Sequence, residues 1–181
     1  MSRSTLAAVL MVDGYNAIGS WPVLAKIRDR DGFEAARRDL TEVLIGYSAF
    51  QGLQTQVVFD AQYQNSPERC EAIAQNLSVC YTNLGQTADT YIEKACARWR
   101  HSLARSQHRL IVATSDQAQR LTVVGYGAEW MSAQQLARDI EDTTLRIKRK
   151  QRSRQRPKGR FLSHSLDREV AEQLAKFRWG L

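Results

Sequence analysis

The chain has 181 residues, of which 43% are hydrophobic and 25% charged, and its formal net charge is +7 at pH 7. This length suits one domain with an appendage, and it can bury a core without disulfides or a structural metal. No stretch approaches the roughly 20 consecutive apolar residues of a membrane-spanning helix, which excludes an integral membrane protein.

The positive charge is concentrated in one segment. Residues 146–160 hold nine of the 26 Lys and Arg residues and no acid, so the other 17 basic residues are outnumbered by 19 acidic ones. This asymmetry predicts a polyanionic partner, either a nucleic acid or a membrane surface. The nine candidate binding residues are Arg146, Lys148, Arg149, Lys150, Arg152, Arg154, Arg156, Lys158 and Arg160.

The three cysteines predict neither a zinc knuckle nor a disulfide framework, because they are odd in number and form no C-x-x-C pair. Cys80 and Cys96 lie in apolar-patterned segments and are expected to be buried thiols. A reducing cytosol fits this usage. The N-terminal apolar run ends in an aspartate without a small-residue cleavage site, so we expect a cytoplasmic protein.

The first predicted strand is the uninterrupted apolar run 6–12, which is typical of a strand buried on both faces. Asp13 and Gly14 follow it directly, and we expect the glycine to allow a sharp turn. A loop is predicted around residues 19–22. A helix follows up to Gly52, with a capping-box pair at its start and one apolar face. The pair is Asp31 and Glu34, and the face is Phe33, Ala36, Leu40, Val43, Leu44 and Tyr47.

The middle of the chain continues this alternation. Residues 57–59 predict a second buried strand that runs into Asp60, and residues 61–67 predict an exposed loop. We expect a short helix over 68–75 and a third strand over 77–81.

The sequence after the third strand predicts two more helices and two more strands. Thr87 is a plausible N-cap for a helix whose apolar face includes Cys96. A fourth strand is expected at 110–113, followed by a short helix to about residue 124. A brief last strand is expected at 129–131.

The C-terminal third predicts two helices separated by a break. Ser132 and Gln135 have capping-box spacing at the start of a helix that continues into the basic segment. Pro157 and Gly159 should end that helix. A final amphipathic helix is expected over 165–179.

The alternation of strands and helices predicts an α/β fold with a mostly parallel central sheet covered by helices on both sides, a three-layer α/β/α sandwich. We expect a domain over residues 1–150. A basic linker and C-terminal helical extension are expected over 151–181.

Four acids have comparable positions in this predicted fold. Asp13, Asp60 and Asp116 directly follow strands, and Asp89 lies in the first turn of the helix after the third strand. Strand carboxyl ends and the following helix N-termini share one edge of such a sheet, so these side chains are expected to converge. Singly, each has a simpler interpretation as a turn former, a helix cap or a favourable charge at a helix N-terminus.

Convergence would favour a metal site, because crowded carboxylates repel one another and no Lys or Arg occupies the strand-end positions. Hard oxygen ligands suit Mg²⁺ or Mn²⁺, which can support phosphodiester hydrolysis. Asn16 can orient Asp13 or hold a metal-bound water, or it makes an Asx-type turn bond. No G-x-G-x-x-G or G-x-x-x-x-G-K-[ST] motif is present, so a nucleotide cofactor is not expected.

Four blocks of the sequence stand out in order within residues 6–149. They are Val12–Pro22 (VDGYNAIGSWP), Val57–Ala61 (VVFDA), Thr87–Lys94 (TADTYIEK) and Ala113–Asp116 (ATSD). Together they resemble the signature blocks of the YacP-like NYN domains, bacterial and plastid members of the PIN-like nuclease superfamily.

The resemblance implies a PIN-like sandwich and an Mg²⁺- or Mn²⁺-dependent endoribonuclease that cleaves mRNA in a ribosome-associated context, in the cytoplasm or the plastid stroma. Its implied acidic site is Asp13, Asp89 and Asp116, with Asn16 beside it and Asp60 close by. Two departures bear on metal affinity, because Gln86 replaces an acid before Thr-Ala-Asp and Thr90 replaces a common Glu after it. The resemblance says little about the basic segment and the last helix.

Two functions of different classes remain open. One is the metal-dependent endoribonuclease, in which the basic segment binds RNA. The other is a non-catalytic RNA- or ribosome-binding module on the same fold. The acidic set favours the enzyme, because a pure binder has no use for clustered negative charge facing phosphates. A membrane-surface role for the basic segment is less favoured, because no obvious aromatic face supports its cations.

Overall fold

A computed structural model describes residues 7–61, 68–102 and 108–155 of the chain. The chain divides into two compact parts, residues 1–145 and 146–181. The first part holds the whole sheet and the helices that cover it. The predicted boundary between residues 150 and 151 stays a prediction.

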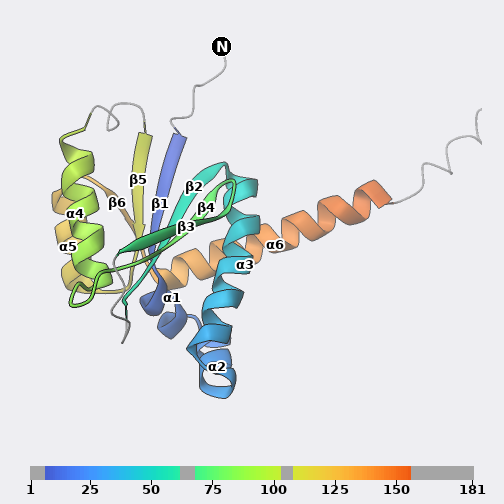
Figure 1. Ribbon diagram of the computed structural model, residues 1–181. Coiled ribbons are helices and arrows are strands. Elements are labelled where there is room, and N and C mark those ends of the chain that lie inside the picture. Colours follow the sequence, from blue (N-terminus) through green and yellow to red (C-terminus); the bar gives the residue numbers. More distant parts are fainter. Residues whose placement is uncertain (1–6, 62–67, 103–107, 156–181) are drawn as a thin grey trace, which may run out of the picture. The chain divides into compact units, whose positions relative to one another are not determined.

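Six strands form one sheet in the first part (Figure 1). They are β1 (Ala7–Asp13), β2 (Leu53–Phe59), β3 (Arg69–Ala74), β4 (Leu77–Tyr81), β5 (His108–Ala113) and β6 (Glu129–Met131). Their order is β3-β4-β2-β1-β5-β6, and every neighbouring pair is parallel except β3 with β4. The strand predicted from the first apolar run is therefore central, with β2 and β5 on its two sides.

Six helices connect or follow these strands in the described part of the chain. They are α1 (Gly14–Ser20), α2 (Pro22–Asp31), α3 (Phe33–Gln51), α4 (Ala88–Arg100), α5 (Gln117–Gly125) and α6 (Ala133–Gln155). Figure 1 shows α4 and α5 on one side of the sheet and α3 on the other. The predicted helix cap at Thr87 is confirmed, because its side chain accepts a hydrogen bond from the Thr90 amide.

The sheet separates two hydrophobic cores because alternate residues of a strand point to opposite faces. In β1, Leu10 and Val12 pack with α1 to α3 and the start of α6, whereas Met11 packs with α4 and α5. The first core includes Leu40, and the second includes Ile92. The predicted three-layer α/β/α sandwich is confirmed.

The register of the parallel strands places the ends of three strands at one edge of the sheet. Asp13, the last residue of β1, pairs with Val58 near the end of β2, and Val12 pairs with Ala113 at the end of β5. The residues that follow β1, β2 and β5 therefore emerge side by side, which is the arrangement that a converging acidic site needs.

The short helix predicted over 68–75 is wrong, because this segment forms the antiparallel edge strand β3. Its Glu, Ala and Gln residues favour a helix locally, but pairing with β4 outweighs that preference. β3 is largely exposed, and its pairing shifts register between Ala72 and Ala74. Charged residues and an irregular register protect such an edge from further strand pairing.

Two predictions about the first connection are also wrong. The residues after β1 form helices α1 and α2, rather than a loop around 19–22. Asp31 ends α2 and does not cap α3, whose N-cap is Gly32. Gly32 has a φ of 89°, a conformation that glycine adopts readily, and it turns the chain sharply between the two helices.

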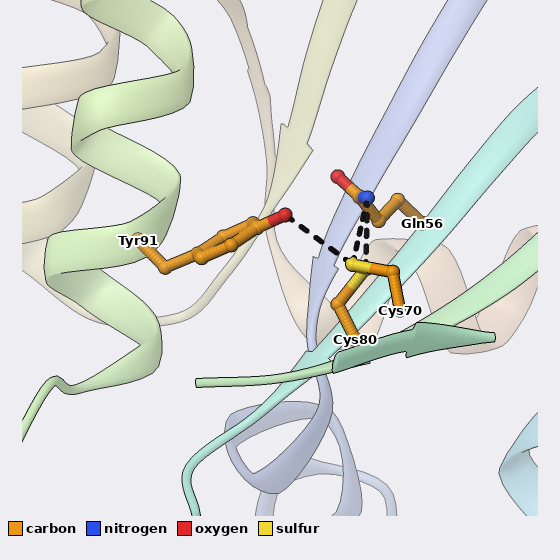
Figure 2. Close-up of a disulfide and its surroundings, with 4 residues drawn as sticks. All are labelled: Gln56, Cys70, Cys80 and Tyr91. Carbon is orange, nitrogen blue, oxygen red and sulfur yellow. Dashed lines mark hydrogen bonds between the residues drawn. A yellow bond between two sulfur atoms is a disulfide. The ribbon is translucent and has the colours of Figure 1, made fainter. Parts of the chain in front are cut away.

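Cys70 and Cys80 form a disulfide between β3 and β4, with their Cα atoms 4.0 Å apart. Figure 2 shows the bridge beside Gln56 of β2 and Tyr91 of α4. The Gln56 carboxamide donates to Cys80 Sγ at 2.9 Å, and Cys70 Sγ lies 3.6 Å from the Tyr91 hydroxyl. The expectation of no disulfide is therefore wrong, because the two cysteines become directly opposed once 69–74 is a strand. Cys96 is a buried free thiol, as predicted.

Helix α6 begins in the first part of the chain and continues to Gln155 in the second. The Ser132 hydroxyl accepts from the Gln135 amide at 3.1 Å, so half of the predicted capping box is present. The predicted break at Pro157 and Gly159 and the predicted helix over 165–179 lie outside the described residues, as do residues 62–67 of the predicted loop.

Candidate acidic active site

Asp13 is the most buried of the candidate acids, with only 7% of its surface exposed. It ends the central strand β1 and caps α1, and its Oδ1 accepts a hydrogen bond from the Asn16 amide at 3.1 Å. The next residue is glycine for a steric reason rather than for a sharp turn, since a Cβ on Gly14 would lie 2.2 Å from the Phe59 ring. The Asp13–Gly14 pair thus places a carboxylate where helix and sheet approach closely.

Asn16 connects Asp13 to the end of β5. Its backbone amide bonds to Asp13, and its side-chain Oδ1 accepts from the Ser115 amide at 2.8 Å. Ser115 immediately precedes Asp116. The carboxamide therefore joins the segments that follow β1 and β5 through two residues that are 99 apart in sequence.

Asp60 follows β2, and its carboxylate accepts a hydrogen bond from the amide of Ala88, the first residue of α4. This bond holds the N-terminal end of α4 against the end of β2. Asp89 is the next residue of α4 and is half-buried. The structural role that sequence analysis considered for Asp60 was to begin a turn. In the structure, Asp60 instead bonds to the first residue of α4 and so brings Asp89 to the sheet edge.

Asp116 caps α5, because its Oδ1 accepts from the amides of Ala118 and Gln119 at 2.7 and 3.0 Å. Its side chain is more exposed than that of Asp13. The capping interpretation from sequence is therefore correct for Asp116. It does not exclude a second role, since a carboxylate has several acceptor positions.

All of these acids line one cavity of about 230 Å³, so the predicted convergence is confirmed. In addition to the predicted residues, Tyr15, Thr87 and Ala88 contribute to its wall, whereas Glu93 does not. No Lys or Arg belongs to this wall among the residues that the structure describes. The cavity is lined by Asp13, Tyr15, Asn16, Asp60, Thr87, Ala88, Asp89 and Asp116. We call it the acidic cavity.

The electrostatics of the acidic cavity favour protonation or a cation. Burial raises the pKa of Asp13 from 3.8 to about 6, and the charges of Asp89, Asp60 and Asp116 add to this rise. The pKa of Asp89 is also raised, mainly by burial and then by Asp116, Asp60 and Glu93. A hydrogen bond with Asp13 opposes this rise in the pKa of Asp89 in part.

The donor set fits Mg²⁺ or Mn²⁺, since every side-chain donor for a cation in the acidic cavity is a hard oxygen. Within residues 7–61, 68–102 and 108–155, no group of three or more Asp, Glu, His or Cys side chains is placed to hold a metal ion. Mg²⁺ commonly binds through one or two carboxylates, keeps several waters and takes further oxygens from a substrate phosphate. Asp13 and Asp89, the two acids of this cavity whose pKa is raised, are the pair best suited to such binding.

Comparison with known proteins assigns the chain to a family. The model of the YacP-like NYN domain matches residues 10–179. The chain belongs to the YacP-like NYN domain family. It is 34% identical over 174 residues to the uncharacterized protein YacP of Bacillus subtilis (strain 168). The alignment covers 95% of this chain and 97% of that protein.

Two crystal structures of Rae1 (YacP) from Bacillus subtilis share the fold and 33% sequence identity. One has a TM-score of 0.67 and covers 95% of each chain. The other, of a mutant, has a TM-score of 0.68 and covers 86% of this chain and 88% of its own. The PIN-like nuclease fold that the sequence resemblance implied is thus confirmed.

The two departures from the family pattern are next in sequence to lining residues of the acidic cavity but do not line it themselves. Neither Gln86 nor Thr90 belongs to its wall in the part of the chain that the structure describes. The carbonyl of Gln86 accepts a hydrogen bond from Thr82, and the amide of Thr90 donates to Thr87. Both therefore support the turn that leads into α4.

The NYN family match continues to residue 179 and so includes the basic segment, whereas the sequence resemblance extended only to about residue 149. Side chains of Arg146, Lys148, Arg149, Lys150 and Arg152 are exposed along the end of α6. Arg154 also lies in α6, whereas Arg156, Lys158 and Arg160 lie outside the described residues. None of the described helices is long and apolar enough to cross a membrane.

Proposed function

We propose that this NYN protein is a Mg²⁺- or Mn²⁺-dependent endoribonuclease that hydrolyses phosphodiester bonds in the acidic cavity. One observation carries the proposal: four aspartates from four separate connections line one cavity whose described wall contains no cation. Such an arrangement is costly for stability alone, because the carboxylates raise one another's pKa. Binding of a divalent cation, together with a phosphate, would offset the repulsion among these carboxylates.

The residues of the acidic cavity have different roles in this proposal. Asp13 and Asp89 would hold the cation, and Asp116 and Asp60 face the same space with part of their acceptor capacity used by backbone amides. A bound divalent cation supplies Lewis-acid activation of a water and neutralises charge on the phosphodiester. Asn16 acts as a positioning residue, since its carboxamide bonds to the Ser115 amide and holds the Asp116 loop near Asp13.

The RNA substrate would be held in part by the basic segment. Its exposed cations lie close together on α6, and contacts of this kind bind phosphates without reading bases. The substrate we propose is mRNA in a ribosome-associated context, because a ribosome offers both a phosphate surface for the basic segment and a nearby single strand for the acidic cavity.

The test uses purified protein with naked RNA and with translating ribosomes, each with Mn²⁺ and with EDTA. We expect new RNA ends that require the metal. Ends that form only on ribosomes would place the substrate there. Equal ends with EDTA, or none with either substrate, would contradict the proposal.

A second candidate is a non-catalytic RNA- or ribosome-binding module. Three aspartates already serve backbone amides, and the described residues contain no complete metal cage, which favours this reading. Tight, metal-independent binding without new RNA ends would select it.

A further inference from the structure

A second cavity, of about 360 Å³, lies between α3 and the strands β2, β3 and β4. Its apolar and aromatic lining residues are Ile45, Phe59, Ile73, Val79 and Tyr81. Its rim is charged and includes Arg37, Arg38 and Glu42. Figure 1 shows α3 beside β2 and β4 at this side of the sheet. The volume is within the range of roughly 300–1,000 Å³ that is typical of small-ligand sites.

Side chains that line this cavity directly contact a side chain that lines the acidic cavity. Tyr15 lines the acidic cavity, and its ring meets that of Phe59 edge-on with centroids 5.2 Å apart. The Arg37 guanidinium donates to the Tyr15 hydroxyl at 3.1 Å. Because Phe59 and Arg37 line the second cavity, a ligand in it would sit next to one in the acidic cavity.

The charges of the second cavity nearly cancel. Arg37 and Arg38 face Glu34, Glu42 and Glu71, and Glu71 is paired with Arg69 at 3.0 Å. An isolated phosphate would gain little from such balanced charges. A flat, neutral heterocycle with hydrogen-bonding edges would find both an apolar wall and donors and acceptors at the rim.

The aromatic groups are arranged for stacking. Phe59 is fully buried, and its ring is stacked against that of Tyr81 with centroids 5.9 Å apart, so the partly buried Tyr81 ring is the aromatic surface that a base can reach. The Arg69 guanidinium lies 5.9 Å from the Tyr81 ring, and that of Arg37 lies 5.9 Å from the Phe59 ring. Aromatic and guanidinium faces of this kind hold the bases of single-stranded nucleic acids.

We propose that this second cavity, which we call the flanking-base cavity, binds the nucleobase of a nucleotide next to the phosphodiester in the acidic cavity. This inference rests on the proposed nuclease function and adds a separate base-binding site to it. A base can enter the cavity only when it is unpaired and unstacked, so the substrate is single-stranded RNA at that nucleotide. Rim groups that contact the edge of the base give the cleavage site a base preference.

Binding is tested apart from cleavage. The Asp89→Asn protein in EDTA is titrated with the tetranucleotides A4, C4, G4 and U4 while the methyl signals of Ile45 and Ile73 are followed by NMR. We expect these signals to shift, with affinities that differ among the four bases. Tyr81→Leu should weaken the preferred tetranucleotide roughly 5- to 100-fold, the range for losing one stacked base.

Matched controls separate the cavity from general effects. Tyr126→Leu removes a partly buried tyrosine on the opposite side of the sheet and should leave affinity unchanged. Arg38→Gln changes an exposed rim residue without disturbing the core, and Arg98→Gln on α4 is its control. Arg38→Gln therefore tests the inference even if Tyr81→Leu fails to fold.

The outcomes distinguish this inference from the nuclease proposal. Binding in the cavity without metal-dependent cleavage by the wild type would support the base site and contradict the nuclease proposal. Cleavage whose KM and base preference are unchanged by Tyr81→Leu and Arg38→Gln would keep the nuclease and overturn the base site. If the Ile45 and Ile73 signals do not shift with RNA but shift with protein concentration, the cavity binds a second copy of the chain. That result also overturns the inference.

Discussion

Replacing Asp13 with asparagine should stabilise the metal-free protein at neutral pH. Burial, and then the charges of Asp89, Asp60 and Asp116, raise the pKa of Asp13 from 3.8 to about 6. One pKa unit corresponds to about 1.4 kcal/mol, so the ionised Asp13 side chain costs the folded state roughly 3 kcal/mol. Asparagine removes the charge and keeps an oxygen that can accept from the Asn16 amide.

The pH dependence has a defined sign. Because the pKa of Asp13 is raised in the folded state, its contribution to stability is fully present below about pH 4 and is lost as the pH rises through about 6. Wild-type protein should therefore lose stability over this window. The Asp13→Asn protein should lose less, and at pH 7.5 it should be more stable by up to about 3 kcal/mol.

The assay is thermal unfolding in EDTA at pH values from 4 to 8. A gain of 3 kcal/mol corresponds to a rise in Tm of roughly 6–12 °C for a chain of this size. Asp142→Asn, at an exposed position of α6, is the control and should change stability by less than about 0.5 kcal/mol. Millimolar Mn²⁺ should stabilise the wild type more than Asp13→Asn. An Asp13→Asn protein with wild-type stability at pH 7.5 would refute the electrostatic account of the cavity.

Three further predictions address packing, the disulfide and the basic segment. Gly14→Ala should lower the free energy of unfolding by about 1–3 kcal/mol in urea titrations, because the new Cβ meets Phe59, whereas Gly19→Ala in the same helix has open space and should not destabilise. Reducing the Cys70–Cys80 bridge, which spans a sequence separation of 10, should cost about 2.7 kcal/mol, and equal melting temperatures with and without dithiothreitol would contradict this. Replacing five exposed cations with glutamine should weaken RNA binding and reduce the magnitude of the slope of log affinity against log salt by up to about 3.5. An unchanged slope would show that the basic segment does not bind RNA phosphates. These cations are Arg146, Lys148, Arg149, Lys150 and Arg152.

The sheet and its acidic edge could be predicted because their signals are local and repeated. An apolar run that ends in Asp13 identifies both a buried strand and the point where it leaves the sheet, and the same pattern recurs at Asp60 and Asp116. Parallel strands then bring these positions together without any knowledge of side-chain contacts. Convergence of the four aspartates therefore follows from topology.

The features that sequence analysis missed depend on contacts between distant residues. Residues 69–74 have a helical preference that pairing with β4 overrides, and the disulfide between Cys70 and Cys80 exists only with that pairing. Phe33 was expected in the core because of its helical spacing, but it is 44% exposed at the start of α3. The structural bonds of Asp60 and Asn16 join segments whose proximity appears only in the folded chain.

Cleavage of RNA by the Asp89→Asn protein tests the central claim most directly. Asp89 is half-buried in the wall that also holds Asp13, and the N-cap of α4 is Thr87 rather than Asp89, so asparagine should leave the fold intact while removing a charge needed for the cation. Glu93→Gln, one turn later on α4 and outside the wall of the acidic cavity, is the matched control. With Mn²⁺ and the RNA substrate cut by the wild type, the account predicts that Glu93→Gln cleaves, that Asp89→Asn does not, and that both bind RNA as the wild type does. Cleavage by Asp89→Asn at the wild-type rate would contradict it.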